Sequence, residues 1–266
     1  MNKIFVHIGM PKTASTSMQK LLKQSEKEIS QYFYIPKACQ TTEEYVNHAN
    51  LFFEFSKDYL YDPALGSFSD LLKEIEKVKK NIILSSEAFS LMLLNDKHKI
   101  FFENSLKKLN FEVVYLCFYR NEVGYFFSTL KELKNQRLRQ PPPFNKFSYI
   151  DDLVHFKNAL LHGWVYDDLN QRDAKYKMYF NIKKFKKKIE RNSSFKFKYF
   201  KHCKTSLLKF GNLFGIKHIN TENFQMNVVH KKNLKYYLYL IPGIIIYILY
   251  KKSINENENK YLLDAD

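Results

Sequence analysis

The chain has 266 residues, within reach of one large α/β domain, and its 43 Lys and Arg against 27 Asp and Glu give a formal net charge of +16. Such a charge favours polyanionic ligands, anionic glycans or acidic lipid surfaces. Three widely separated cysteines exclude a disulfide framework. Because neither a zinc pattern nor an RNP-type aromatic motif is present, we predict that nucleic acid is not a partner and that no metal is bound.

The amino-terminal stretch 3–17 (KIFVHIGMPKTASTS) predicts a strand, a tight loop and a helix start. Apolar residues alternate up to Gly9, and apolar residues at helical spacing begin at Met18. The N–H groups at a helix N-terminus bind anions, Lys12 adds a full positive charge, and the hydroxyls of residues 13–17 add donors. We therefore expect this loop to cradle a phosphate or a phosphate-like group.

Strands and helices alternate along most of the remaining chain. The patterns predict, in order, a helix over 16–29, a strand near 32–35, helical structure over 41–75 with breaks at Pro63 and Gly66, a strand over 81–86, a helix around 97–109, a strand over 111–119, a helix over 121–135, helical structure over 149–168, a strand over 195–200 and a helix over 206–214. This alternation implies parallel strands joined by right-handed crossovers, and so an α/β three-layer fold with a central parallel sheet flanked by helices.

Two predicted strands end in charged residues. The apolar strand at 81–86 runs into Glu87, and the one at 111–119 runs into Arg120. Open α/β sheets bind ligands at the carboxyl ends of their strands, so both side chains are candidates for a site. The alternatives are a helix N-terminal Glu favoured by the helix dipole and a solvated Arg at a strand end.

The order Pro-Lys-Thr-Ala-Ser-Thr-Ser over 11–17 resembles the 5′-phosphosulfate loop of sulfotransferases, Pro-Lys-[Ser/Thr]-Gly-[Ser/Thr]-Thr. An ordinary nucleotide loop is excluded because its Lys directly follows the second Gly, whereas here the Lys comes earlier. The resemblance implies a P-loop-like fold and binding of 3′-phosphoadenosine 5′-phosphosulfate. It implies that the phosphosulfate is held by Lys12, Thr13, Ala14, Ser15, Thr16 and Ser17. Ala14 departs from the usual Gly, which costs stability or shifts the backbone if the loop requires a positive φ there.

The same resemblance extends to the two strand ends. The family's 3′-phosphate site has an Arg at a strand end and a Ser eight residues later, the spacing of Arg120 and Ser128. In carbohydrate sulfotransferases a Glu at a comparable place is the general base, which implies that role for Glu87. Cytosolic members that act on small phenols and steroids use a His instead, so histidines at positions 7, 48 and 155 stay open as competitors.

The segment 137–148 (RLRQPPPFNKFS) interrupts the alternation because three consecutive prolines are incompatible with a helix. In the family the segment after the 3′-phosphate helix forms part of the acceptor cleft. The resemblance thus implies that Arg137, Arg139 and Lys146 meet an acidic sugar. The alternative for each residue is a solvated surface loop.

We divide the chain into a sulfotransferase domain over 1–230, an apolar segment over 231–252 and a polar tail over 253–266. The run 236–250 (YYLYLIPGIIIYILY) is shorter than a usual membrane span and contains Pro-Gly. A core helix, an interfacial segment and a shortened span all remain open for it. Because the first strand begins at the amino terminus without an apolar leader, we expect a cytoplasmic enzyme, with association at the inner face of the membrane as a further option.

The predicted function is transfer of a sulfuryl group from 3′-phosphoadenosine 5′-phosphosulfate to a hydroxyl of a carbohydrate or glycolipid, leaving 3′,5′-adenosine bisphosphate. Lys12 and Glu87 are the predicted catalytic residues. The alternatives are another P-loop phosphotransferase or kinase, and a non-enzymatic basic protein that binds a membrane surface or an anionic glycan.

Overall fold

The computed structural model describes residues 2–9, 13–120, 164–167, 175–178, 182–203, 205–217, 219, 245 and 248. A five-stranded sheet lies at its centre, and its strands run parallel in the order β2-β3-β1-β4-β7. The strands are β1 (Lys3–Gly9), β2 (Phe33–Tyr34), β3 (Asn81–Ser86), β4 (Glu112–Tyr119) and β7 (Lys196–Lys201).

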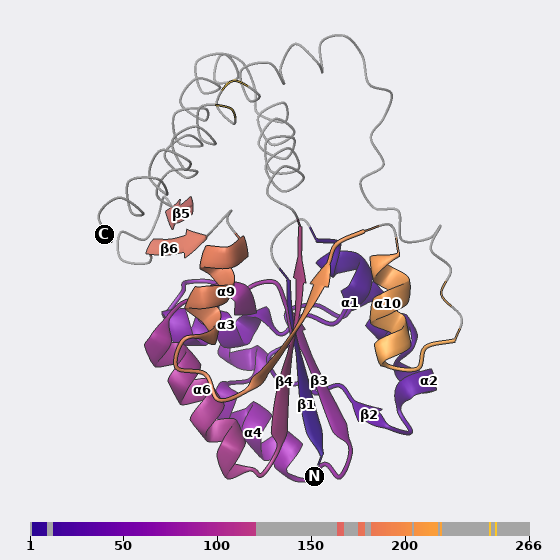
Figure 1. Ribbon diagram of the computed structural model, residues 1–266. Coiled ribbons are helices and arrows are strands. Elements are labelled where there is room, and N and C mark those ends of the chain that lie inside the picture. The colour runs from indigo at the N-terminus through magenta and orange to yellow at the C-terminus, as the bar shows by residue number, and fades with distance from the viewer. Residues whose placement is uncertain are drawn as a thin grey trace, which may run out of the picture.

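Helices cover both faces of this sheet (Figure 1). The helices on one face are α3 (Ala49–Ser56), α4 (Phe68–Glu76), α5 (Phe89–Met92), α6 (Asp96–Lys108) and α9 (Ile182–Glu190). Those on the other face are α1 (Ser15–Gln24), α2 (Glu26–Ile29) and α10 (Ser206–Leu213). The expected α/β three-layer fold with a central parallel sheet is therefore confirmed.

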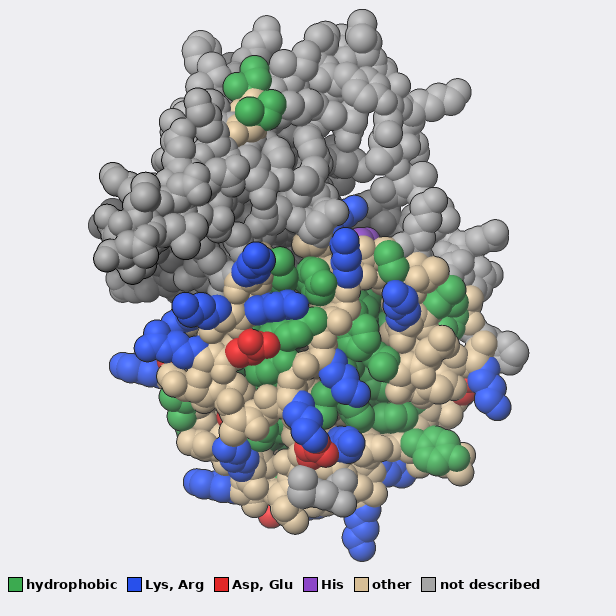
Figure 2. All heavy atoms as spheres, viewed as in Figure 1, with side chains coloured by type: hydrophobic (Ala, Val, Ile, Leu, Met, Phe, Trp, Pro, Cys, Tyr) green, Lys and Arg blue, Asp and Glu red, His purple; other side chains and the backbone are tan. Residues whose placement is uncertain are grey.

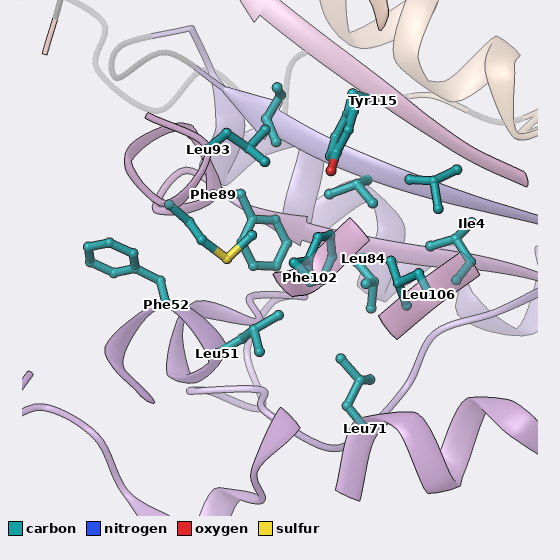
Figure 3. Close-up of a cluster of buried hydrophobic side chains, with 14 of the residues drawn as sticks. Ile4, Leu51, Phe52, Leu71, Leu84, Phe89, Leu93, Phe102, Leu106 and Tyr115 are labelled. Carbon is teal, nitrogen blue, oxygen red and sulfur yellow. The ribbon is translucent and has the colours of Figure 1, made fainter. Parts of the chain in front are cut away.

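The core consists of two apolar clusters, one on each face of the sheet. Strand β4 contributes to both because its side chains alternate between the faces: Tyr115 and Cys117 enter the α3–α6 cluster, whereas Leu116 and Phe118 enter the α1–α10 cluster. Figure 3 shows the first cluster, where Phe89 and Phe102 lie beneath the sheet. A central parallel strand buried on both faces explains the continuous apolar run that this segment shows in the sequence.

Most of the predicted strands and helices are confirmed within the described residues. The strand at 81–86 matches β3, and the strand expected over 195–200 is β7, shifted by one residue. The helix expected over 16–29 is divided at Ser25 into α1 and α2. Helix α10 ends near Gly215, whose φ of +73° suits glycine. The helix expected over 121–135 lies outside the described residues.

Two of the helical predictions are wrong. Residues 41–48 are not helical, because the N–H of His48 donates to the Ser85 carbonyl (2.8 Å) and that of Thr41 to the Asn47 carbonyl (2.8 Å). Residues 164–167 form β5 (Trp164–Asp167), which pairs antiparallel with β6 (Lys175–Met178). Cross-strand pairing outweighs the weak local helical pattern in that segment.

A short 3₁₀ helix, η1 (Pro63–Leu65), separates α3 from α4, where breaks were expected at Pro63 and Gly66. Within the described part of the chain, no helix combines the length and the apolar character that crossing a membrane requires.

Candidate functional site

The loop between β1 and α1 lies at the carboxyl edge of the central strand. Ala14 immediately precedes α1 with φ 67° and ψ 26°, the left-handed conformation. The loop thus has the positive φ that a glycine would adopt without strain. The loop also requires glycine at position 9, because a Cβ there would collide with the Ser15 hydroxyl. Gly9 and Ser15 therefore lie close together.

Hydroxyl groups line this turn. Thr13, Ser15 and Ser17 are all buried, and the Thr13 Oγ1 and Ser15 Oγ atoms lie 3.4 Å apart. Ala14 has no side-chain oxygen to cap α1, and the first turn of the helix contains no acidic residue. The positive end of the α1 dipole is therefore not compensated by a capping side chain at Ala14 or by a carboxylate in the first turn. Such a helix N-terminus is suited to binding an anion.

Arg120 and His202 meet the same loop. Arg120 follows β4, His202 follows β7, and the N–H of His202 donates to the Tyr119 carbonyl at 2.6 Å. Burial lowers the pKa of His202 and the nearby Arg120 charge lowers it further, whereas a hydrogen bond with the Thr13 backbone raises it. His202 therefore joins the loop after β1 to the strand end that carries Arg120.

Partial burial also changes the pKa and the electrostatic environment of the Arg120 guanidinium. Desolvation lowers the pKa of its guanidinium from the usual value of 12.5. A half-buried guanidinium offers stronger electrostatic attraction to an anion than a fully solvated one, because the local dielectric constant is lower. The Nδ1 atom of His202 is buried and has no hydrogen-bond partner within the described part of the chain. The two side chains together form a polar, electropositive edge.

Glu87 reaches the same edge through the register of the sheet. Ser86 pairs with Ile8, and Gly9 pairs with Phe118, so Glu87, the loop and Arg120 all leave the sheet at its carboxyl side. The Glu87 carbonyl accepts hydrogen bonds from the N–H (3.0 Å) and the hydroxyl (2.7 Å) of Ser90. These bonds fix the backbone of the turn, and the Glu87 side chain is partly exposed.

The competing histidines within the described residues occupy the core. His7 is fully buried, its Nδ1 lies 2.7 Å from the Ser85 hydroxyl, and its ring packs against Phe118 and Phe210. Burial lowers its pKa to about 3. His48 uses both ring nitrogens on backbone groups: Nε2 donates to the Pro36 carbonyl (3.1 Å), and Nδ1 accepts from the Ser85 N–H (3.2 Å). Neither imidazole is exposed to an acceptor hydroxyl.

Several predicted site residues lie outside the described residues: Lys12, Ser128, Arg137, Arg139, Lys146 and His155. Of the remaining ones, the structure brings Thr13, Ala14, Ser15 and Arg120 to one edge of the sheet, with Thr16 and Ser17 in the first turn of α1. Sequence analysis missed His202. The available signal was its position two residues after the strand predicted over 195–200, similar to the strand-end position that identified Arg120.

No protein-family model and no curated protein matches the chain. Among solved structures, the chain is similar to one described as the PezAT chromosomal toxin-antitoxin system of Streptococcus pneumoniae, with 15% identity and a TM-score of 0.30. The similarity covers 60% of this chain and 63% of that one, less than two thirds of either. A likeness this low carries no argument about function.

Proposed function

We propose that the chain is a sulfotransferase that moves a sulfuryl group from 3′-phosphoadenosine 5′-phosphosulfate to a hydroxyl of a carbohydrate or glycoconjugate. The observation that carries the proposal is the left-handed Ala14 in a hydroxyl-lined turn, joined through His202 to Arg120. One edge of the sheet thereby offers two anion-binding elements, the loop and the Arg, which suits a nucleotide with phosphates at two positions.

The residues present fit such a nucleotide. At Gly9 a Cβ would meet the Ser15 hydroxyl, so glycine is required there, and the buried His202 Nδ1 at the same edge has no hydrogen-bond partner among the described residues. The loop residues and Lys12 would hold the 5′-phosphosulfate. Arg120, with Ser128, would bind the 3′-phosphate through the guanidinium fork.

The transfer itself requires positioning and charge stabilisation. Glu87 would accept the proton of the acceptor hydroxyl while that oxygen forms a bond to sulfur and the bond between sulfur and the phosphate oxygen breaks. Lys12 would stabilise the negative charge that develops on the leaving phosphate. Glu87 suits the role of base because it is partly exposed at the site, whereas His7 and His48 are buried.

The acceptor is most simply a neutral or acidic sugar in the cytoplasm or at the inner face of the membrane. The positive charge of the chain would concentrate an anionic glycan near the site. Arg137, Arg139 and Lys146 are the residues that we propose for acceptor binding.

Isothermal titration tests the proposal directly. Without Mg²⁺, 3′,5′-adenosine bisphosphate should bind more tightly than AMP or ATP. Loss of a charge-assisted contact costs about 1.5–3 kcal/mol, so Arg120→Ala should weaken the bisphosphate roughly 10- to 150-fold and AMP hardly at all. Arg191→Ala, which removes an exposed arginine at the end of α9, is the matched control and should change neither affinity.

Equal affinity of the wild type for AMP and the bisphosphate would contradict the proposal, and tighter Mg²⁺-dependent binding of ATP would favour a phosphotransferase. For the base, Glu87→Gln should abolish most transfer while leaving bisphosphate binding intact. Near-normal turnover of this variant, combined with loss of turnover in His7→Asn, would assign the base to His7.

A further inference from the structure

One face of the molecule is formed by α9, β7 and the turn between them, residues 182–203, which we call the basic face. This stretch contains nine Lys or Arg and one Asp or Glu, a net charge of +8, which is half of the +16 of the whole chain. Figure 2 shows many Lys and Arg side chains and few Asp and Glu side chains on the side of the molecule on which β7 lies. The excess charge is therefore concentrated rather than spread evenly.

The packing of α9 and β7 directs these charges outward. Helix α9 buries Phe185 and Ile189 against the sheet, which leaves Lys187 exposed on its opposite side. Strand β7 is an edge strand, and its Lys196, Lys198 and Lys201 are exposed. Lys196 and Lys198 pair with Val114 and Leu116, so they lie on the sheet face opposite α9. The exposed lysines therefore lie on the outer side of α9 and along the open edge of the sheet.

Neighbouring carboxylates neutralise only part of this charge. Asp96 pairs with Lys188 (3.1 Å), and Glu112 pairs with Lys196 (2.7 Å). The one acidic residue of the face, Glu190, accepts a hydrogen bond from the Tyr199 hydroxyl (2.7 Å). The exposed lysines without an ion pair to any described residue include Lys187, Lys198 and Lys201.

The chemistry of the face indicates which kind of anion it meets. Eight of its nine cations are lysines, which act as flexible point charges, whereas directional recognition of single phosphates or sulfates favours the planar fork of arginine. Along β7 the lysines alternate with Phe197 and Tyr199, which pack against the core on the face that α9 covers. The Lys186 ammonium lies over the rings of Tyr119 (4.9 Å) and Tyr199 (4.0 Å). A diffuse array of exposed lysines suits a plane of anionic headgroups.

Elsewhere in the chain, Ile245 and Ile248 are helical and more than half exposed, 52% and 59%. Exposed large aliphatic side chains of this kind are typical of a helix that contacts lipid at the interface.

We propose that the basic face docks on a bilayer surface rich in anionic lipid. The attraction is long-ranged electrostatics between the exposed lysines and the lipid phosphates. It does not depend on the nature of the reaction at the carboxyl edge of the sheet, so it can be tested whether or not sulfuryl transfer is found.

The test uses the full chain and sedimentation with vesicles of phosphatidylcholine alone or with 30% phosphatidylglycerol, a fraction chosen for the assay, at about 0.1 M salt. Each lysine near an anionic surface contributes about 5-fold in affinity, so the triple variant Lys187→Gln, Lys198→Gln, Lys201→Gln should bind the anionic vesicles roughly 100-fold more weakly. The matched control changes Lys27, Lys77 and Lys79, exposed lysines outside the basic face, to Gln and alters the net charge by the same amount.

The proposal expects wild-type binding to anionic but not to neutral vesicles, strong loss in the basic-face variant and less than 5-fold loss in the control. Equal loss of vesicle binding in both triple variants would show that net charge alone determines binding, and would overturn the proposal. Binding to neutral vesicles that the substitutions leave unchanged would overturn it in favour of an apolar anchor. Failure to bind vesicles, with tight binding of a single-stranded oligonucleotide, would reassign the face to nucleic acid. Because all six side chains are exposed, equal melting temperatures check that the variants are folded.

Discussion

At the scale of single residues, Ala14 combines a position in the proposed phosphosulfate loop with a conformational cost. Its left-handed backbone, φ 67° and ψ 26°, is unfavourable for a residue with a Cβ by about 1–2 kcal/mol. Its two neighbours, Thr13 and Ser15, are both buried. Backbone strain of this kind clusters at functional sites, which agrees with the anion-binding role that we propose for the loop.

Ala14→Gly should therefore raise the free energy of unfolding by about 0.5–1 kcal/mol, since relief of the strained φ exceeds the extra freedom of glycine in the unfolded chain. Urea denaturation at pH 7.5 measures the change. Ala49→Gly, at the first residue of α3, is the control and should lower stability by about as much. A destabilised Ala14→Gly variant would show that the left-handed conformation is not strained in the folded protein.

The sequence allowed the loop, Glu87 and Arg120 to be assigned to one edge because each follows a recognisable apolar strand. It did not reveal His202 as a link between them. That contact depends on β7 pairing beside β4, a long-range choice that no local pattern encodes. Residue types near strand ends were thus predictable, whereas the partners of their side chains were not.

At the scale of secondary-structure elements, α9 depends on a buried lysine from another helix. Lys99 of α6 is fully buried, and its ammonium lies 3.2 Å from an Asp96 carboxylate oxygen. It donates to the carbonyls of Ile189 (3.3 Å) and Arg191 at the carboxyl end of α9. The cation thus satisfies orphan carbonyls where the helix dipole is negative.

Replacement of Lys99 by Met keeps most of the side-chain volume and removes the charge. The carbonyls at the end of α9 then lose their donor in a buried place, so the free energy of unfolding should fall by about 2–4 kcal/mol. Thermal and urea denaturation measure the loss. Lys97→Met, at an exposed position of the same helix, should stay within about 0.5 kcal/mol of the wild type. Equal effects of the two substitutions would contradict the capping role.

Helix α9 also shows why some elements escaped prediction. Its sequence, IKKFKKKIE, reads locally as a charge run, and only three apolar positions, Ile182, Phe185 and Ile189, mark its inner side. Residues 41–48 show the opposite case, where a helical expectation failed because backbone groups bond to β3 and within the loop. In both segments tertiary contacts, rather than intrinsic propensity, determine the conformation.

At the scale of the whole molecule, two neutral histidines connect the sheet to the loop that precedes α3. Ser85 of β3 lies between them: its hydroxyl meets His7 Nδ1 at 2.7 Å, and its N–H donates to His48 Nδ1 at 3.2 Å. All three residues are fully buried. A protonated imidazole in this environment would place an unpaired charge in the core, so burial lowers the pKa of His7 to about 3 and that of His48 to about 4.

These two residues make the fold sensitive to acid. In the unfolded chain both histidines bind protons below about pH 6.5, whereas in the folded protein they remain neutral until pH 4 to 3. Between about pH 6.5 and pH 4 to 3 the unfolded state therefore binds more protons than the folded state. The contribution of the neutral histidines to the free energy of unfolding is fully present above pH 6.5 and is lost as the pH falls through this range. The loss begins below about pH 6.5, and each pH unit corresponds to about 1.4 kcal/mol per proton. Each histidine should therefore lower the free energy of unfolding by about 2 kcal/mol between pH 7.5 and pH 5.

His7→Gln removes one of the two titrating groups, so its free energy of unfolding should depend less steeply on pH, although the variant is less stable at pH 7.5 because the contact with Ser85 changes. Urea denaturation of wild type, His7→Gln and His48→Gln at pH 7.5, 6 and 5 measures the slopes. The loss between pH 7.5 and 5 should shrink by about 2 kcal/mol in each variant. Parallel pH curves for all three proteins would show that the imidazoles titrate alike in the folded and unfolded states, and so that the buried pair does not set the acid limit of the fold.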